Sequence, residues 1–129
     1  MNPPDQYKSG ICNIGEKEIS VRKKFLLFFL PFVFLLTALC FSYSDSLLCW
    51  FALIAFTFAA IVLYLEIRYR FCILFGFFNL YNFGRLGNLS EVKCSDDRKR
   101  DRKRTLQIVV QALLVSVIYA SVTHLLAMN

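Results

Sequence analysis

The chain has 129 residues, of which 57% are hydrophobic, and a formal net charge of +6 at neutral pH. A soluble domain of this size intersperses its charges among its apolar residues. Here three long windows contain no Asp, Glu, Lys or Arg: residues 25–43, 47–65 and 105–129. Each window is long enough to cross a hydrocarbon core of about 30 Å as a helix, and backbone hydrogen bonding in lipid requires helices. The composition excludes an ordinary soluble fold and predicts an all-α membrane protein with three transmembrane helices.

The chain order gives a cytoplasmic N-terminal segment, residues 1–24, followed by a single membrane domain, residues 25–129. The predicted spans are about 25–43, 47–66 and 105–127, and a cytoplasmic loop, 67–104, separates the last two. The first apolar run is too long for a signal peptide and lacks a small-residue cleavage site, so we expect an uncleaved anchor.

The basic residues predict the orientation of these spans. Every Lys and Arg falls within residues 8–24 or 68–104, whereas the short loop between the first two spans carries only Asp45. By the positive-inside rule, both basic segments lie in the cytoplasm. The expected location is the bacterial cytoplasmic (inner) membrane, with the N-terminus inside and the C-terminus outside.

A juxtamembrane helix is predicted just before the first span. Asn13 can cap its N-terminus, and Glu16, three residues later, can reach back to the capping residue. Glu18 lies four residues before Arg22, a spacing that supports a helix. A solvated basic flank without a helix is the alternative.

The aromatic segment Phe71–Phe83 is short for a span. If it crossed the bilayer, the basic run 98–104 would lie outside, against the charge rule. We therefore predict a short interfacial or re-entrant aromatic helix within the cytoplasmic loop.

Small residues recur on two of the spans at three- and four-residue spacing, which lets helix backbones approach closely in lipid. These faces are predicted to pack together, and their residues are Ala52, Ala55 and Ala59 in the second span and Ala112, Ser116 and Ala120 in the third. His124 continues the register of the third span, where a hydrogen bond within the bundle is favoured over ligand binding.

The run 98–104 contains six cations in seven residues. Such a run can bind anionic lipid headgroups at about 1 kcal/mol per charge, or it can simply fix the topology. Nucleic acid is not the expected partner, because no separate fold presents the run. The candidate headgroup-binding residues are Arg98, Lys99, Arg100, Arg102, Lys103 and Arg104.

Five cysteines fall into two groups. Cys40 and Cys49 flank the outer hairpin, where a disulfide is possible, although free thiols are favoured. Cys12, Cys72 and Cys94 are cytoplasmic candidates for a metal site, but they lack Cys-x-x-Cys spacing and have no His on their side of the membrane.

No catalytic motif is present, so the chain is predicted not to be an enzyme, and no cofactor is assigned. Glu66 is the one carboxylate at the edge of a span, and Arg70 four residues later is its predicted partner. A proton relay would need a second buried ionisable group, and none is visible in the spans.

Two stretches form a motif pair: Cys12-Asn13-Ile14-Gly15, and Arg70-Phe71-Cys72 followed by Asn82-Phe83-Gly84. The chain resembles, over roughly half its length, a family of small uncharacterised bacterial integral membrane proteins with Cys-Asn-Ile-Gly and Phe-Cys…Asn-Phe-Gly motifs. The resemblance supplies no catalytic residues. It implies that the two stretches, with Cys12 and Cys72, belong together in one cytoplasmic patch.

The sequence therefore predicts a non-enzymatic small membrane subunit, anchor or assembly factor that presents this patch to a protein partner within a larger complex or homo-oligomer. The candidate partner-binding residues are Asn13, Gly15, Phe71, Cys72, Phe75, Gly76, Asn82, Phe83 and Gly84. One alternative is a thiol redox or metal-binding membrane protein that uses Cys12 and Cys72. Another is an immunity or lysis-type small membrane protein.

Overall fold

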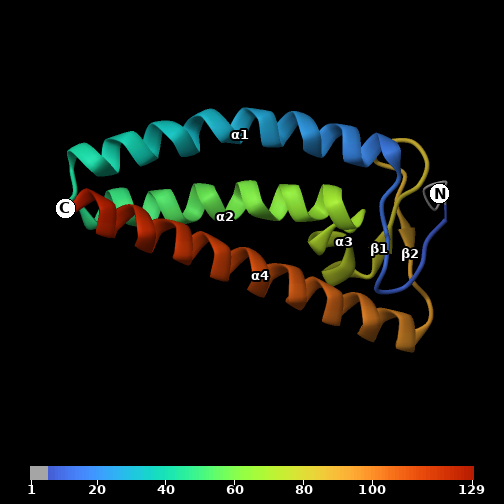
Figure 1. Cartoon of the computed structure of the whole chain (residues 1–129). Coiled ribbons are helices and arrows are strands. Elements are labelled where there is room, and N and C mark those ends of the chain that lie inside the picture. Colours follow the sequence, from blue (N-terminus) through green and yellow to red (C-terminus); the bar gives the residue numbers. More distant parts are fainter. Residues whose placement is uncertain (1–5) are drawn as a thin grey trace.

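The computed structural model describes residues 6–129, so residues 1–5 of the predicted N-terminal segment lie outside the described part. Three long helices run along the molecule, and a short helix and two short strands lie together at one end (Figure 1). The elements are α1 (Glu16–Ser42), α2 (Leu47–Tyr69), α3 (Ile73–Phe78), β1 (Leu80–Tyr81), β2 (Ser90–Glu91) and α4 (Ser95–Ala127). The three long helices are each long and apolar enough to cross a membrane. The predicted helical architecture with three candidate membrane spans is confirmed at this level.

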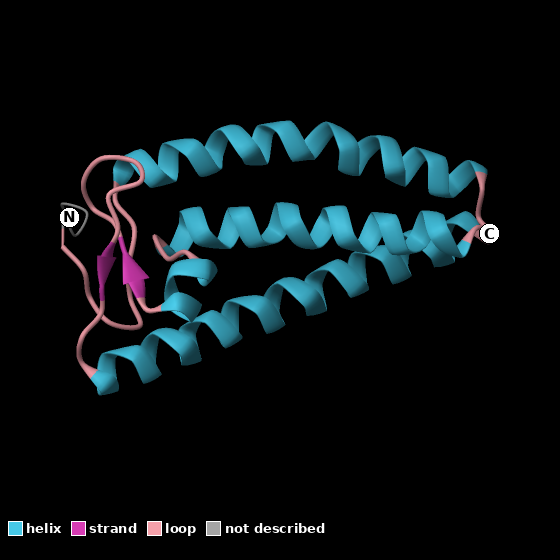
Figure 2. Ribbon diagram, turned by 180° about the vertical axis from the view of Figure 1, so that it is seen from behind, coloured by secondary structure: helices cyan, strands magenta, loops and turns pink. Residues whose placement is uncertain are grey.

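The two ends of the bundle differ in character. At one end, α1 turns into α2 through a tight hairpin close to the C-terminus (Figure 1). At the other end the N-terminal segment, α3, β1 and β2 lie between α1 and α4 (Figures 1 and 2). The Trp50 indole N–H donates to the carbonyl of Ser44 at 2.8 Å and closes the hairpin. We call the end opposite the hairpin the cap. It consists of residues 6–15, residues 70–94 and the first turns of α1 and α4.

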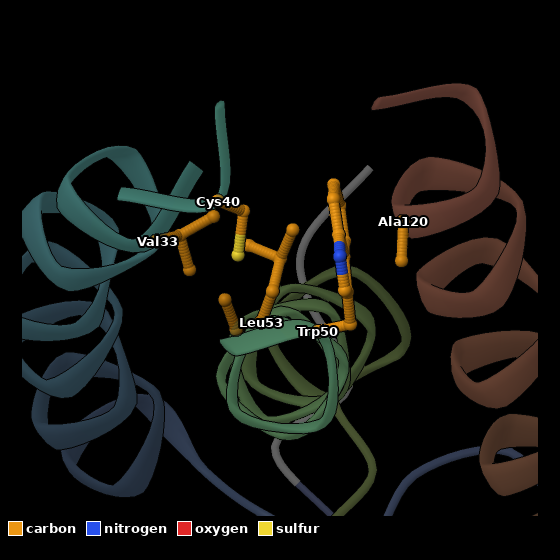
Figure 3. Packing of buried hydrophobic residues seen from close by; sticks show 6 residues of the cluster. Val33, Cys40, Trp50, Leu53 and Ala120 are labelled. Atoms are coloured by element: carbon orange, nitrogen blue, oxygen red, sulfur yellow. The ribbon is translucent and has the colours of Figure 1, made fainter. Parts of the chain in front are cut away.

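The bundle core is built from α1, α2 and α4 near the hairpin end. Leu53 and Trp50 of α2 lie between Val33 and Cys40 of α1 on one side and Ala120 of α4 on the other (Figure 3). The outer faces of the long helices leave many large apolar side chains exposed, including those of Leu27, Phe34 and Leu114. A continuous apolar exterior marks a surface that lies against lipid.

The packing faces follow the prediction on one helix and depart from it on the other. On α4 the small-residue positions are buried: Ala112, Ser116 and Ala120. On α2, Ala55 is exposed, whereas Ala52 and Ala59 are half-buried. The buried neighbours on α2 are Leu53, Thr57 and Ala60. The packing face of α2 is thus rotated from the predicted stripe, because the large side chain of Leu53 fills the space between the helices.

Two helix starts differ from the predictions. α1 begins at Glu16 with Gly15 as its N-cap and no side-chain cap, so Asn13 does not cap the helix and the predicted juxtamembrane helix is continuous with the first span. α4 begins at Ser95, so the basic run 98–104 is helical and does not belong to a loop. Two aspartates in the first turn of α4 favour this start, because they complement the positive end of the helix dipole.

Cys40 and Cys49 are free thiols, as the sequence favoured. They lie on facing helices near the hairpin, in the same apolar cluster. Two short paired strands, β1 and β2, were not predicted from the sequence. Their two-residue length leaves no alternating pattern to detect.

Candidate functional site

The two motif stretches meet in the cap. Cys12–Gly15, Arg70–Cys72 and Asn82–Gly84 form a buried unit that we call the motif junction. Its backbones are paired: the N–H of Asn13 donates to the carbonyl of Arg70 at 3.1 Å, the N–H of Asn82 to the carbonyl of Asn13 at 2.9 Å, and the N–H of Gly15 to the carbonyl of Asn82 at 2.8 Å. The N-terminal segment is therefore clamped between the end of α2 and the residue after β1.

The side chain of Asn13 is the centre of this unit. Its Oδ1 accepts from the N–H of Cys72 at 2.7 Å, and its Nδ2 donates to the carbonyl of Cys72 at 3.0 Å. Asn13 is fully buried, so these bonds take the place of water at the Cys72 N–H and, together with the N–H of Gly76 at 3.0 Å, at the Cys72 carbonyl. Arg70 ends α2 in the left-handed region with φ of 55°. The Asn13 amide hydrogen-bonds to the backbone of Cys72, just beyond this turn.

Asn82 has an equivalent role on the other side of the junction. Its Nδ2 donates to Glu18 Oε1 at 2.9 Å and to the carbonyl of Arg85 at 3.0 Å, and its Oδ1 accepts from the N–H of Gly84 at 3.0 Å. All of its hydrogen bonds are made within the chain, in a position that is 1% exposed. Asn82 thereby fixes the turn that follows β1 to the first turn of α1.

A buried network of charges adjoins Asn82. Arg22 donates through Nη1 to Glu18 Oε2 at 2.7 Å and through Nε to Glu66 Oε2 at 2.9 Å. The three side chains are 7–12% exposed. Glu66 Oε1 also accepts from the N–H of Ile73 at 2.9 Å, which places a carboxylate at the start of α3. We call Glu18, Arg22 and Glu66 the carboxylate–arginine network.

The predicted Glu18–Arg22 pair is confirmed, whereas the predicted Glu66–Arg70 pair is wrong. Arg70 instead forms an ion pair with Glu16 at 2.6 Å. The left-handed conformation of Arg70 ends the helix, so the regular i,i+4 geometry that would bring it to Glu66 is lost.

The junction also holds two thiols in buried positions. Cys72 lies beside Arg22 and Glu66, and burial is the main reason that its pKa is raised, with the Glu66 carboxylate adding to the effect and Arg22 opposing it. Burial likewise raises the pKa of Cys12, which donates a hydrogen bond to the carbonyl of Gln6 at 3.4 Å. Both groups are therefore protonated thiols at neutral pH, the weakly nucleophilic form.

Cys94 is exposed at the start of α4, whereas Cys12 and Cys72 are buried in the junction. Within residues 6–129, no group of three or more His, Cys, Asp or Glu side chains is close enough to hold a metal ion.

Sequence reasoning missed one residue of the cap. Asp101 is fully buried: its Oδ1 accepts from the N–H of Gly10 at 2.6 Å, and its Oδ2 from the Tyr7 hydroxyl at 2.7 Å. Burial raises the pKa of Asp101, although both hydrogen bonds act in the opposite direction. The signal that could have found it is a single acidic residue inside a run of cations.

Most of the predicted partner-binding residues are internal parts of the cap. Gly84 is exposed and Phe75 and Phe83 are half-buried, whereas the remaining six are buried: Asn13, Gly15, Phe71, Cys72, Gly76 and Asn82. Direct contact of these six with a partner is therefore corrected to a structural role. Their polar groups hydrogen-bond to one another, so they build the cap and do not face outward.

Besides Ile11, the surface of the cap has two exposed apolar parts. On α3 these are Leu74, Phe77 and Phe78, and in the loop between β1 and β2 they are Leu86 and Leu89. α3 is held against α4, because Thr105 donates to the carbonyl of Ile73 at 3.4 Å and Gly76 lies so close to Thr105 that a Cβ at position 76 would overlap its hydroxyl.

The remaining predicted residues lie outside the junction. His124 contacts the Trp50 ring edge-on at a centroid distance of 4.7 Å, near the hairpin. Within the basic run, Arg98 donates to the carbonyl of Val92 at 2.6 Å and pairs with Glu91 at 3.1 Å. The other cations are exposed or half-buried along α4: Lys99, Arg100, Arg102, Lys103 and Arg104.

The fold and the cap together define a class: a multi-pass helical membrane protein whose polar end is locked by hydrogen bonds and buried ion pairs. Comparison of the chain with protein-family models, with curated proteins and with solved structures finds no match.

Proposed function

We propose that the chain is a non-enzymatic small membrane subunit, anchor or assembly factor of the bacterial cytoplasmic membrane. Its cap lies on the cytoplasmic side, and the hairpin and the C-terminus lie outside. The distribution of charge supports this orientation, because the basic residues gather in the cap and its adjoining helix ends. The cap then faces anionic lipid headgroups at its edge and the cytoplasm beyond it.

In this orientation α3 is an interfacial helix. It packs beside Thr105, where the apolar part of α4 begins, and it exposes Leu74, Phe77 and Phe78. A short helix with large apolar side chains at this depth inserts them at the boundary of headgroups and acyl chains.

The observation that carries the proposal is that the motif residues satisfy one another's hydrogen bonds inside the cap. The motif residues therefore form a rigid platform. What it offers outward is the β1–β2 loop, which exposes Leu86 and Leu89 beyond the apolar belt of the bundle. We propose that this loop contacts the protein partner, since exposed apolar side chains at the tip of a fixed turn are typical contact residues.

The thiol alternative has less support. A thiol that performs redox chemistry or binds a metal needs an accessible thiolate, and such cysteines have a lowered pKa. Cys12 and Cys72 have raised pKa values and are 1–2% exposed. Their packing is that of small apolar side chains.

Site-specific photo-crosslinking from Asn88, at the tip of the loop, tests the proposed contact. In native membranes the wild-type loop is expected to give a discrete crosslinked product, and Leu86→Ser with Leu89→Ser is expected to reduce its yield at least about fivefold, because the apolar contact is lost. Ile11→Ser is the matched control, since Ile11 is an equally exposed apolar residue elsewhere in the cap. Equal yields from both variants, or no product from the wild type, would contradict the proposal.

Thiol labelling tests the orientation. Cys94 is exposed, and we expect a membrane-impermeant maleimide to label it only in inverted vesicles, with the signal abolished by Cys94→Ser. Asp45→Cys in the Cys94→Ser background places the probe in the hairpin, where labelling is expected only in intact cells. Cys12 and Cys72 should react slowly at neutral pH and faster as the pH rises, because a raised pKa keeps the thiolate fraction small. Labelling of Cys94 in intact cells would reverse the proposed orientation.

A further inference from the structure

A cavity of about 250 Å³ lies between the N-terminal segment and the first turns of α4. It is lined by Ser9, Gly10, Arg100, Lys103, Arg104 and Gln107. Three of these side chains are cations, and no carboxylate contributes to the lining. The one nearby acid, Asp101, is turned to Tyr7 and Gly10, which engage both of its oxygens. The cavity therefore presents a positive surface without its own counter-ion.

The cations of the cavity are not neutralised elsewhere in the described chain. Among residues 6–129, Arg100, Lys103 and Arg104 form no ion pair, whereas Arg98 on the same helix pairs with Glu91. The guanidinium of Arg104 lies over the Tyr69 ring at 4.3 Å, and its buried Nε has no hydrogen-bond partner among residues 6–129. The aromatic ring fixes the guanidinium plane and leaves its charge available to an anion.

The position of the cavity indicates which anion it would bind. Arg104 is the last charged residue before the apolar part of α4, and Gln107 lies one turn further along the same helix. In the proposed orientation this boundary is the depth of the lipid phosphates. Arginine binds phosphate oxygens in a planar, bidentate geometry, and Lys103 and the Ser9 hydroxyl can add further donors.

We propose that this cavity is a binding site for a phosphate group, and that its physiological occupant is the headgroup of an anionic phospholipid. The site deepens the proposed contact of the cap with anionic lipid and rests on the proposed orientation. It differs from a diffuse basic surface, because Ser9 and Gly10 reach it only when the N-terminal segment is held on Asp101. Lipid binding thereby depends on the docked cap.

Native mass spectrometry of the full chain in detergent tests the site, with phosphatidylglycerol and phosphatidylcholine as probes. The wild type is expected to retain phosphatidylglycerol preferentially. Arg100→Gln with Lys103→Gln is expected to weaken that binding by about 10-fold or more. The matched control, Lys99→Gln with Arg102→Gln, removes the same charge from exposed positions outside the cavity and should weaken binding less than about twofold. If the first double variant does not fold, as judged by circular dichroism, two single variants replace the double variants. Lys103→Gln, in the cavity, is then the test, and Arg102→Gln, outside it, is the control.

Equal weakening in both double variants would overturn the site in favour of diffuse attraction, as would equal retention of the two lipids by the wild type. Millimolar inorganic phosphate provides the second arm. If phosphate displaces the lipid from the wild type, the cavity binds phosphate but its occupant is the free ion, and the lipid part of the proposal is overturned. If phosphate does not displace the lipid, the lipid headgroup is supported as the occupant. These outcomes are independent of crosslinking from the β1–β2 loop, so the two proposals can fail separately.

Discussion

Replacement of Asn13 with alanine is expected to destabilise the folded chain by about 1–3 kcal/mol, a substantial fraction of the stability of a small domain. The substitution removes both hydrogen bonds to Cys72, at 2.7 and 3.0 Å, and leaves its buried N–H without a partner, whereas its carbonyl still accepts from the N–H of Gly76 at 3.0 Å. Each orphaned buried group costs about 1–3 kcal/mol. The loss is expected to appear as a lower midpoint in a detergent unfolding titration followed by circular dichroism.

Two further variants separate the amide chemistry from a general effect of mutation. Asn88→Ala changes an asparagine in the exposed loop of the same cap and should leave the midpoint within about 0.5 kcal/mol of wild type. Asn13→Asp keeps an acceptor for the Cys72 N–H but places a carboxylate oxygen against its carbonyl, so it should be at least as destabilising as Asn13→Ala. Loss of the junction should also speed maleimide labelling of Cys72. A midpoint for Asn13→Ala equal to that of Asn88→Ala would show that the two bonds do not hold the cap.

The behaviour of Asn13 shows why the spans could be predicted and the cap could not. Hydropathy over a window is a local property, so the three long helices follow from the sequence. The Asn-x-x-Glu spacing at Asn13 also indicated a local structure, a helix cap. In the folded chain a non-local partner prevails, because the turn at Arg70 leaves the buried N–H of Cys72 in need of an acceptor, which the Asn13 side chain supplies.

The same limit applies to the charged residues. The Glu18–Arg22 pair has a helical spacing and was predicted, whereas Arg22 also reaches Glu66, 44 residues away, which no spacing rule reveals. The burial of Asp101 depends on an N-terminal segment that folds back over α4. The expected association of the Cys12 and Cys72 stretches is present, since the Asn13 side chain hydrogen-bonds to the backbone of Cys72, 59 residues away.

The junction and the carboxylate–arginine network form one structural unit. Asn82 donates to Glu18, and Glu66 accepts from the N–H of Ile73, so the network connects α1, α2, α3 and the turn after β1. A rigid platform of this kind holds the β1–β2 loop in one position relative to the bilayer. That is the property that a subunit or anchor needs, since a preorganised contact surface loses little conformational entropy when a partner binds.

Arg22→Leu is expected to have the largest effect of any single charge substitution, a destabilisation of about 3–5 kcal/mol. Two carboxylates with side chains 7–12% exposed would lose their shared cation and remain buried. The detergent unfolding titration should show a lower midpoint, and α3 should detach from the bundle because Glu66 holds its first N–H. Arg68→Leu, at an exposed position near the end of α2, is the control and should be close to neutral.

The triple variant Glu18→Gln, Arg22→Leu, Glu66→Gln distinguishes loss of charge balance from loss of packing. Glutamine keeps an oxygen that can accept from Asn82 and from the N–H of Ile73, and it removes the uncompensated charges. We therefore expect the triple variant to recover most of the stability lost in Arg22→Leu, since a buried ion network can be replaced by neutral groups at little cost. If the triple variant is as unstable as Arg22→Leu, the guanidinium acts through its packing and its contact with the Phe75 ring at 5.7 Å, and electrostatic pairing is secondary. If Arg22→Leu itself matches Arg68→Leu, the network does not hold the cap, and the rigid platform on which the proposed partner contact depends is excluded.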